Sequence, residues 1–122
     1  IVHAIALVLL FLMMAQPTFD NIRAMTTGVM VAGDVTVEVT FSKMALHVVA
    51  MIVGWVGLWW FFNRQKRGAY ASIVAHLLGL TAVLTQTPEL LGIMPPAAIA
   101  VFFVVMFTVA LGPVLAFKDQ YS

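Results

Sequence analysis

The stretch MALHVVAMIVGWVGLWWFF, which spans residues 44–62, decides the fold class of this chain. It holds no acidic residue, lysine or arginine, and at about 1.5 Å per helical residue it can cross a hydrocarbon core of about 30 Å. Its end, residues 59–62, is wholly aromatic, and aromatic side chains favour the lipid headgroup region. Ser42 lies just before the stretch, where an N-cap residue is expected. We therefore predict a transmembrane helix here.

Three further stretches without formal charge flank this one. They cover about residues 1–16, 68–84 and 97–117, and each is close to the length of a membrane span. Pro17 is expected to end the first, because proline lacks the amide hydrogen that a helix interior needs. Hydrophobic residues make up 63% of the chain and charged residues only 9%, whereas soluble domains carry about 25% charged residues. The sequence predicts an all-α integral membrane protein with four transmembrane helices in an up-down bundle, which form a single membrane domain over residues 1–122.

The connection between the first two predicted helices, residues 17–43, is the longest polar segment. Residues 35–39 alternate between valine and polar side chains, which is typical of a β-strand with one buried face. Gly33-Asp34 is a turn sequence that would lead back to residues 29–31. We predict a short β-hairpin here, which needs a support because a lone hairpin is marginally stable in water.

Basic residues predict the orientation of the chain. Arg64, Lys66 and Arg67 cluster in the connection of residues 63–67, and a further lysine follows the last helix. Such residues favour the cytoplasmic side of a membrane. We therefore expect both termini and the 63–67 loop in the cytoplasm, and loop 17–43 on the outer side.

The residue inventory disfavours several classes of function. The four predicted spans contain no Asp, Glu, Lys or Arg, which argues against a proton-coupled transporter, because such a protein needs ionisable groups within the membrane. The chain has no cysteine, and it shows no nucleophile–base pair, paired carboxylates or metal-ligand cluster. A net charge of +1 is not that of a nucleic-acid-binding surface. We expect no nucleic-acid partner, no metal site, no catalytic residue and no enzymatic activity of the chain by itself.

Two of the three histidines, His47 and His76, lie on helical faces of small residues. Small residues allow transmembrane helices to approach closely, and polar side chains on such faces usually bind a neighbouring helix through hydrogen bonds. We therefore predict helix packing at five small residues on these two faces: Ala50, Gly54, Gly57, Ser72 and Gly79.

A b-type haem is the alternative role for the histidines, with His76 and either His3 or His47 as cofactor-binding residues. Folding the second and third helices into a hairpin places His76 level with Gly54 and His47 level with Val83. The two histidines are then about 10 Å apart in depth. A single iron needs both nitrogens at one level, so this pair is disfavoured, whereas His3 and His76 lie toward the same side. Our first prediction is that the chain binds no cofactor, and haem b is the alternative.

One local pattern resembles a known helix. His47, Trp55, Gly57 and Leu58 are similar to the histidine–tryptophan–glycine–leucine helix of the copper-resistance D and protoporphyrinogen-oxidase-like membrane families. The resemblance covers about a dozen residues, and the valine-rich outer loop does not follow it. We do not assign the chain to either family.

These features favour a small accessory or structural subunit of a larger membrane complex, such as an oxidoreductase or respiratory-type assembly. The chain would stabilise that complex through helix packing and its outer loop. Its expected partners are the lipid bilayer and other membrane subunits, and Phe102, Phe103 and Phe107 are expected to face one or the other. The alternative is a stand-alone four-helix protein that binds a lipid or a small apolar molecule within its bundle.

Overall fold

The computed structural model describes residues 1–32, 35–86 and 95–122. Its helices and strands, in chain order, are α1 (Val2–Thr27), β1 (Val29–Ala32), β2 (Val35–Glu38), α2 (Phe41–Phe62), α3 (Lys66–Gln86), α4 (Pro96–Ala116) and the 3₁₀ helix η2 (Lys118–Gln120). The structure is 85% helical. Each of the four α-helices is long and apolar enough to cross a membrane.

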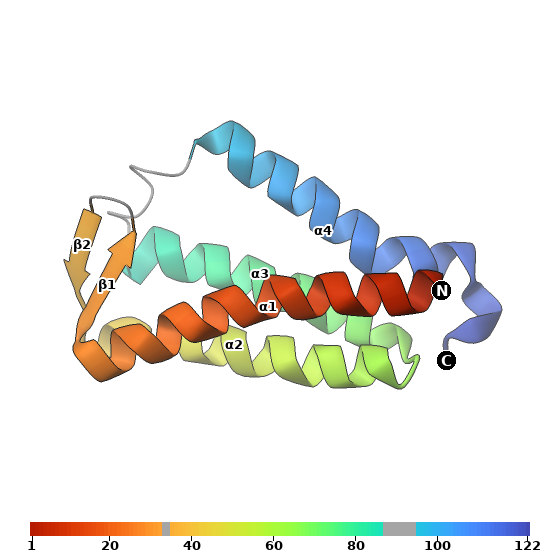
Figure 1. Cartoon of the computed structure of the whole chain (residues 1–122), viewed down its shortest axis with the longest axis horizontal. Coiled ribbons are helices and arrows are strands. Elements are labelled where there is room, and N and C mark those ends of the chain that lie inside the picture. The colour runs from red at the N-terminus through yellow and green to blue at the C-terminus, as the bar shows by residue number, and fades with distance from the viewer. Residues whose placement is uncertain (33–34, 87–94) are drawn as a thin grey trace.

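The predicted fold class is confirmed. Successive helices run in opposite directions, and the two-stranded sheet lies between α1 and α2 (Figure 1). Both termini lie at one end of the bundle, which we call the terminal end, and the sheet lies at the other, which we call the hairpin end (Figure 1).

Helix α1 differs from the prediction, because it does not end at Pro17. It continues through this proline for ten more residues to Thr27. The helix ends at Gly28, whose φ of 74° is left-handed and whose amide donates to the Ala24 carbonyl at 2.8 Å. A glycine in this conformation is a common helix terminator. The last turns of α1 bury Asn21 and Ala24, so the tertiary packing of this face outweighs the hydrogen bond that Pro17 cannot make.

The predicted hairpin forms. The connection that contains it is shorter than the predicted loop of residues 17–43, because α1 extends to Thr27 and α2 begins at Phe41. Strands β1 and β2 pair antiparallel with Met30 opposite Val37. Both side chains are buried with Ala24 and Met44 in a small core at the hairpin end. The hairpin therefore has the support that its length requires. Residues 33–34, where the turn was predicted, lie outside the described part of the chain.

Helix α2 begins three residues earlier than predicted. Its N-cap is Thr40 rather than Ser42, and the Thr40 hydroxyl accepts from the Lys43 amide at 3.4 Å. The threonine has the extended backbone that an N-cap needs, whereas Ser42 lies inside the helix. The ends of α3 and α4 fall within two residues of the predictions.

Helices α2 and α3 form a close pair, and glycines make this possible. A Cβ atom at Gly57 would lie 2.8 Å from the Ala71 Cβ and 3.0 Å from the Ser72 amide nitrogen. At the terminal end, Gly68 lies directly against the backbone of Phe61. Small residues here allow backbone-to-backbone contact. Gly57 and Ser72 are two of the residues for which the sequence predicts helix packing.

The terminal end of the bundle is tightly held. His3 Nδ1 and the Tyr121 hydroxyl form a hydrogen bond of 2.7 Å, and the His3 ring stacks on Phe61 with 5.0 Å between ring centroids. The Ser122 amide donates to the Arg64 carbonyl at 2.9 Å, and the Lys66 amide donates to the Ser122 carbonyl at 3.0 Å. These contacts join α1, the α2–α3 connection and the segment after α4.

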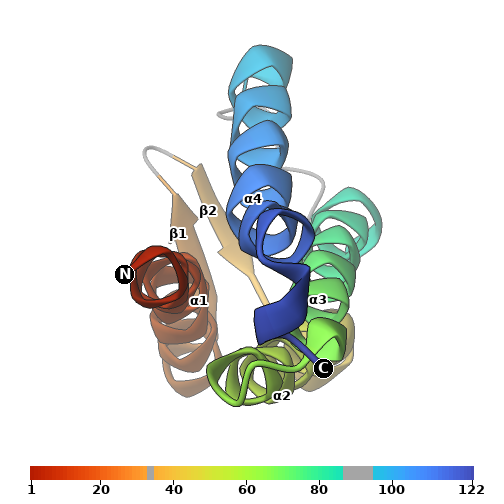
Figure 2. The same ribbon diagram turned by 90° about the vertical axis from the view of Figure 1, so that its right-hand side faces the viewer.

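Helix α4 contributes its fully buried residues to the main core from its second half. Met106, Ala110 and Val114 are buried in the main core, together with Leu10 and Phe61. Toward the hairpin end α4 diverges from α1 and α3 (Figures 1 and 2). Its first turn, residues 96–98, is exposed. The helices are thus packed together at the terminal end, and α4 lies apart from α1 and α3 at the hairpin end (Figures 1 and 2).

Candidate ligand-binding site

A cavity of about 600 Å³ lies in the hairpin half of the bundle, where α4 diverges. All four helices and strand β1 contribute to its lining. Most of the lining is apolar, for example Met51 of α2, Leu80 and Val83 of α3, and Ile99 and Phe103 of α4. Small-molecule sites in proteins have volumes of about 300–1,000 Å³ and a mainly apolar lining with a few polar groups. The cavity has both properties.

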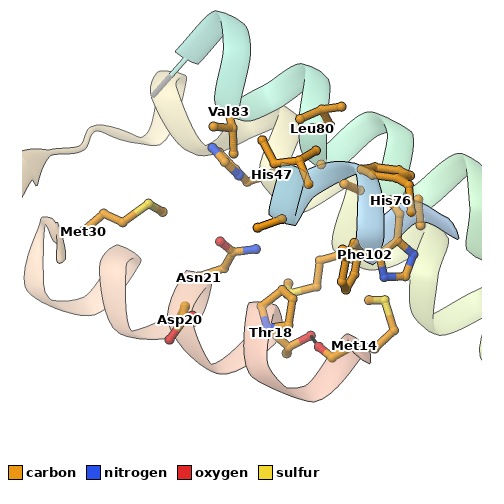
Figure 3. Close-up of a pocket in the computed structure, with 18 of the residues that line it drawn as sticks. Met14, Thr18, Asp20, Asn21, Met30, His47, His76, Leu80, Val83 and Phe102 are labelled. Carbon is orange, nitrogen blue, oxygen red and sulfur yellow. Dashed lines mark hydrogen bonds between the residues drawn. The ribbon is translucent and has the colours of Figure 1, made fainter. Parts of the chain in front are cut away.

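The extension of α1 beyond Pro17 supplies polar groups to one wall. Thr18, Asp20 and Asn21 line the cavity, and Asn21 is buried although its side chain is an amide. Thr18 donates to the Met14 carbonyl at 2.7 Å and accepts from the Trp55 indole nitrogen at 2.8 Å. Figure 3 shows Thr18 and Asn21 on the face of α1 that borders the cavity.

His76 is the polar group of the opposite wall, on α3. Its Nδ1 lies 2.7 Å from the Ser72 carbonyl oxygen. A carbonyl oxygen can only accept, so Nδ1 carries the proton. The Nε2 atom is inaccessible to solvent and has no hydrogen-bond partner within the described residues. The ring lies beside Phe102, with 5.5 Å between centroids, and near Met14 (Figure 3).

His47 lines the same cavity from α2, with only 6% of its surface exposed. In the view of Figure 3 it is drawn next to Val83, and both residues line the cavity; the helix-hairpin geometry predicts that these two residues are level. Gly54, predicted to be level with His76, faces Ala75, the residue before His76. The two histidines therefore share one cavity but sit at different depths in it.

His3 lies outside this cavity. It sits in the cluster with Phe61 and Tyr121 at the terminal end of the bundle, whereas His76 lines the hairpin half. The structure thus brings His76 together with His47 and not with His3.

The five small residues predicted for helix packing divide into two groups. Gly54, Gly57 and Ser72 are buried between helices, with the Met14 side chain against Gly54. Ala50 and Gly79 instead line the cavity. At Gly79 a Cβ atom would meet no described atom within 4 Å, so this glycine borders open space and not a neighbouring helix.

The electrostatic character of the cavity limits its ligands. Among its described lining residues Asp20 is the only one with a formal charge, and none is a lysine or arginine. A ligand with anionic groups would meet no lysine or arginine among these described residues, which are the usual partners of such groups. The described residues also contain no group of three or more metal-ligating side chains.

Sequence reasoning missed Thr18, Asp20 and Asn21 because it ended the first helix at Pro17. The available signal was helical spacing past the proline, since Met14, Asn21 and Ala24 recur at helical intervals and all three are buried. Phe102 and Phe103, expected to face lipid or a partner, line the cavity as well. A scan against protein-family models, a search of curated proteins and a search of solved structures each found no match for this chain.

Proposed function

We propose that this chain is a membrane protein that binds a small, neutral, mostly apolar molecule within its helix bundle. The observation that supports this proposal is the cavity of about 600 Å³ between the four helices. A closed four-helix bundle would fill this volume with side chains, because protein interiors are close-packed. Here the terminal half follows that rule, and the hairpin half does not.

The lining favours a neutral ligand over b-type haem. Haem carries two propionate groups, which bind best to arginine or lysine, and the one charged residue among the described lining is the acidic Asp20. A neutral amphiphile avoids this conflict. Its apolar part would contact Leu80, Val83 and Phe103, and its polar part would meet the imidazole and amide groups.

An apolar molecule dissolved in the bilayer would reach such a cavity from within the membrane. The side chains of α4 near the cavity are small or apolar, and Ala98 and Phe102 are both exposed and in its lining. The proposed entry from the hydrocarbon region therefore lies beside these exposed lining side chains of α4.

Filling the cavity provides the test. Gly79→Leu places a side chain in the cavity, where the space around Gly79 is open. Gly112→Leu is the matched control, because Gly112 is also a helical glycine with no described atom within 4 Å of its Cβ position, and it lies outside the cavity lining. The wild-type chain and both variants are purified in mild detergent and examined by native mass spectrometry.

We expect wild type and Gly112→Leu to carry the same bound molecule, and Gly79→Leu to carry at least tenfold less. Extraction and fragmentation of the bound molecule then give its identity. Wild-type protein without any bound small molecule, after purification and after incubation with a total lipid extract, would refute the proposal.

Membership of a larger complex is a second proposal, and the two-stranded sheet favours it. In the described residues the sheet order is β1–β2, so each strand has one edge without a strand partner. Such edges are sites where another chain can add a strand. Native gel electrophoresis of gently solubilised membranes tests this, because a subunit migrates with its partners. Migration of the native chain at its own mass would contradict this proposal and leave ligand binding unaffected.

We also propose that the terminal end is cytoplasmic, because Arg64, Lys66 and Arg67 lie there. The chain has no cysteine, so single-cysteine variants report accessibility directly. Asn63→Cys and Thr36→Cys occupy exposed positions at opposite ends of the bundle. A membrane-impermeant thiol reagent added to intact cells is expected to label Thr36→Cys only. Labelling of Asn63→Cys alone would reverse the orientation.

A further inference from the structure

The protonation pattern of His76 defines what its free nitrogen can bind. The Nδ1–H group is used by the Ser72 carbonyl one turn earlier on α3, at 2.7 Å. In the neutral imidazole the other nitrogen, Nε2, then has a lone pair and no proton. This nitrogen is therefore a hydrogen-bond acceptor, and it does not donate.

The position of this acceptor makes it a recognition group. Nε2 is inaccessible to solvent, and no described residue provides it with a hydrogen bond. Buried polar atoms are nearly always paired, and an unpaired one costs free energy. His76 lines the cavity, and the exposed Phe102 side chain lies against its ring. A ligand in the cavity supplies the missing donor when this side chain turns aside.

We propose that the ligand of this cavity carries a hydroxyl group, as a long-chain alcohol or a phenol does, and that this hydroxyl donates to His76 Nε2. The inference rests on the proposed function, and it names the chemical class of the ligand. A ketone, quinone, ester or ether offers only acceptor oxygens, which repel the lone pair of Nε2. The hydroxyl of an alcohol or phenol is neutral, in agreement with the absence of lysine and arginine from the described lining.

The rest of the cavity fits the remainder of such a molecule. Leu80 and Val83 follow His76 along α3 toward the hairpin end and line the cavity, and Ile99 of α4 lines it as well. An apolar chain anchored at His76 would therefore extend between α3 and α4. Phe102 lies against the imidazole and shields the hydrogen bond from water, which strengthens it.

A competition between two probes tests the inference. Geranylgeraniol has a hydroxyl donor, and its methyl ether has the same chain and oxygen without the donor. Both are added in equal amounts to the purified full chain, and native mass spectrometry reads the ratio of the two complexes, which differ in mass by one methylene group. We expect the alcohol complex to exceed the ether complex by about tenfold or more, as one hydrogen bond to a buried acceptor provides.

Two substitutions locate the acceptor. His76→Phe keeps a ring of similar size and removes both nitrogens, and we expect its alcohol-to-ether ratio to fall to about one. His76→Gln is the conservative variant, because its side-chain oxygen reaches the position of Nε2 and can accept, and we expect it to retain a preference for the alcohol. Gly112→Leu, remote from the cavity, should give the wild-type ratio.

Equal binding of both probes by the wild-type chain would overturn the hydroxyl inference and leave the proposed function standing. A preference for the alcohol that persists in His76→Phe would also overturn it, since another group would then be the acceptor. Binding of neither probe rejects the hydroxyl class, and the proposed function is then decided separately by the molecule that co-purifies with wild type and is lost in Gly79→Leu.

Discussion

The indole nitrogen of Trp55 on α2 donates to the hydroxyl of Thr18 on α1, at 2.8 Å. The same hydroxyl donates to the Met14 carbonyl one turn earlier on α1, at 2.7 Å. Thr18 directly follows Pro17, at the point where the backbone of α1 lacks one hydrogen-bond donor. The pair therefore links α1 to α2 at the turn where the α1 backbone lacks this donor, and Asn21, about one turn further along α1, lines the cavity.

The first prediction concerns this pair. Trp55→Phe removes the donor and keeps a large aromatic side chain, and Thr18→Val removes the acceptor with little change in volume. Hydrogen bonds between transmembrane helices contribute about 0.6 kcal/mol on average and up to about 1.7 kcal/mol. We expect a coupling free energy of this size in a double-mutant cycle measured by reversible unfolding in mixed micelles. A coupling indistinguishable from zero would show that the two side chains do not stabilise one another.

The second prediction concerns the α2–α3 contact at Gly57. A methyl group there would approach the Ala71 Cβ to 2.8 Å and the Ser72 backbone nitrogen to 3.0 Å, and the backbone cannot move aside as a flexible side chain would. We expect Gly57→Ala to lower the free energy of unfolding by about 1–3 kcal/mol, as overpacking does. Gly112→Ala is the control, because the space around it is open. If both variants unfold at the wild-type midpoint, the helices are not in close contact at Gly57.

The sequence was informative about elements and less so about their ends. Long charge-free stretches predicted the four helices, because a membrane span has to satisfy both a length and an apolar composition. The end of α1 was predicted wrongly at Pro17. The rule that proline ends a helix considers only the local backbone, and it takes no account of the burial of Asn21 and Ala24 by residues distant in the sequence. Gly28 carried the correct signal, but a glycine marks a helix end only once its backbone conformation is known.

The candidate site could be predicted only in part, again because some of its features depend on contacts between residues that are distant in the sequence. The spacing of small residues predicted that His47 and His76 lie on small-residue faces of their helices, and helical geometry predicted that they lie at different depths. Both line the cavity in the structure. Neither the spacing nor the geometry of single helices could show that α4 diverges from α1 and α3, because that divergence depends on how the whole bundle packs. Gly79 and Gly57 both lie on small-residue faces of their helices. Gly79 nevertheless borders the cavity, whereas Gly57 lies against the backbone of α3.

The third prediction concerns the end of α1. Gly28 has a φ of 74°, a conformation that favours glycine, and a Cβ there would meet no described atom within 4 Å. Any loss of stability on substitution therefore comes from the backbone alone. We expect Gly28→Ala to lower the free energy of unfolding by about 1 kcal/mol. Gly28→Asn should cost less, because asparagine tolerates the left-handed region. Equal losses for alanine and asparagine would point to a lost contact instead of backbone strain.

The fourth prediction concerns the hydroxyl of Tyr121, which lies outside the membrane-spanning helices. Burial raises its pKa above the ordinary value of about 10, and the nearby Arg64 guanidinium offsets part of this shift. The folded chain thus holds this proton more tightly than the unfolded chain does. The stabilisation from the neutral hydroxyl, which is hydrogen-bonded to His3 at 2.7 Å, is fully present below pH 10 and is lost as the pH rises through the folded-state pKa.

Tyr121→Phe isolates this contribution, because it keeps the ring that packs on Phe61 and removes only the hydroxyl. We expect wild type to be more stable than the variant by about 0.5–1.5 kcal/mol at pH 8, and the difference to shrink as the pH passes 10. Tyr70→Phe is the control, because Tyr70 is exposed on α3, and it should match wild type at pH 8. A wild-type advantage that stays constant from pH 8 to the highest pH at which the protein remains folded would contradict the assignment, since ionisation of Tyr121 would then not weaken its contact with His3.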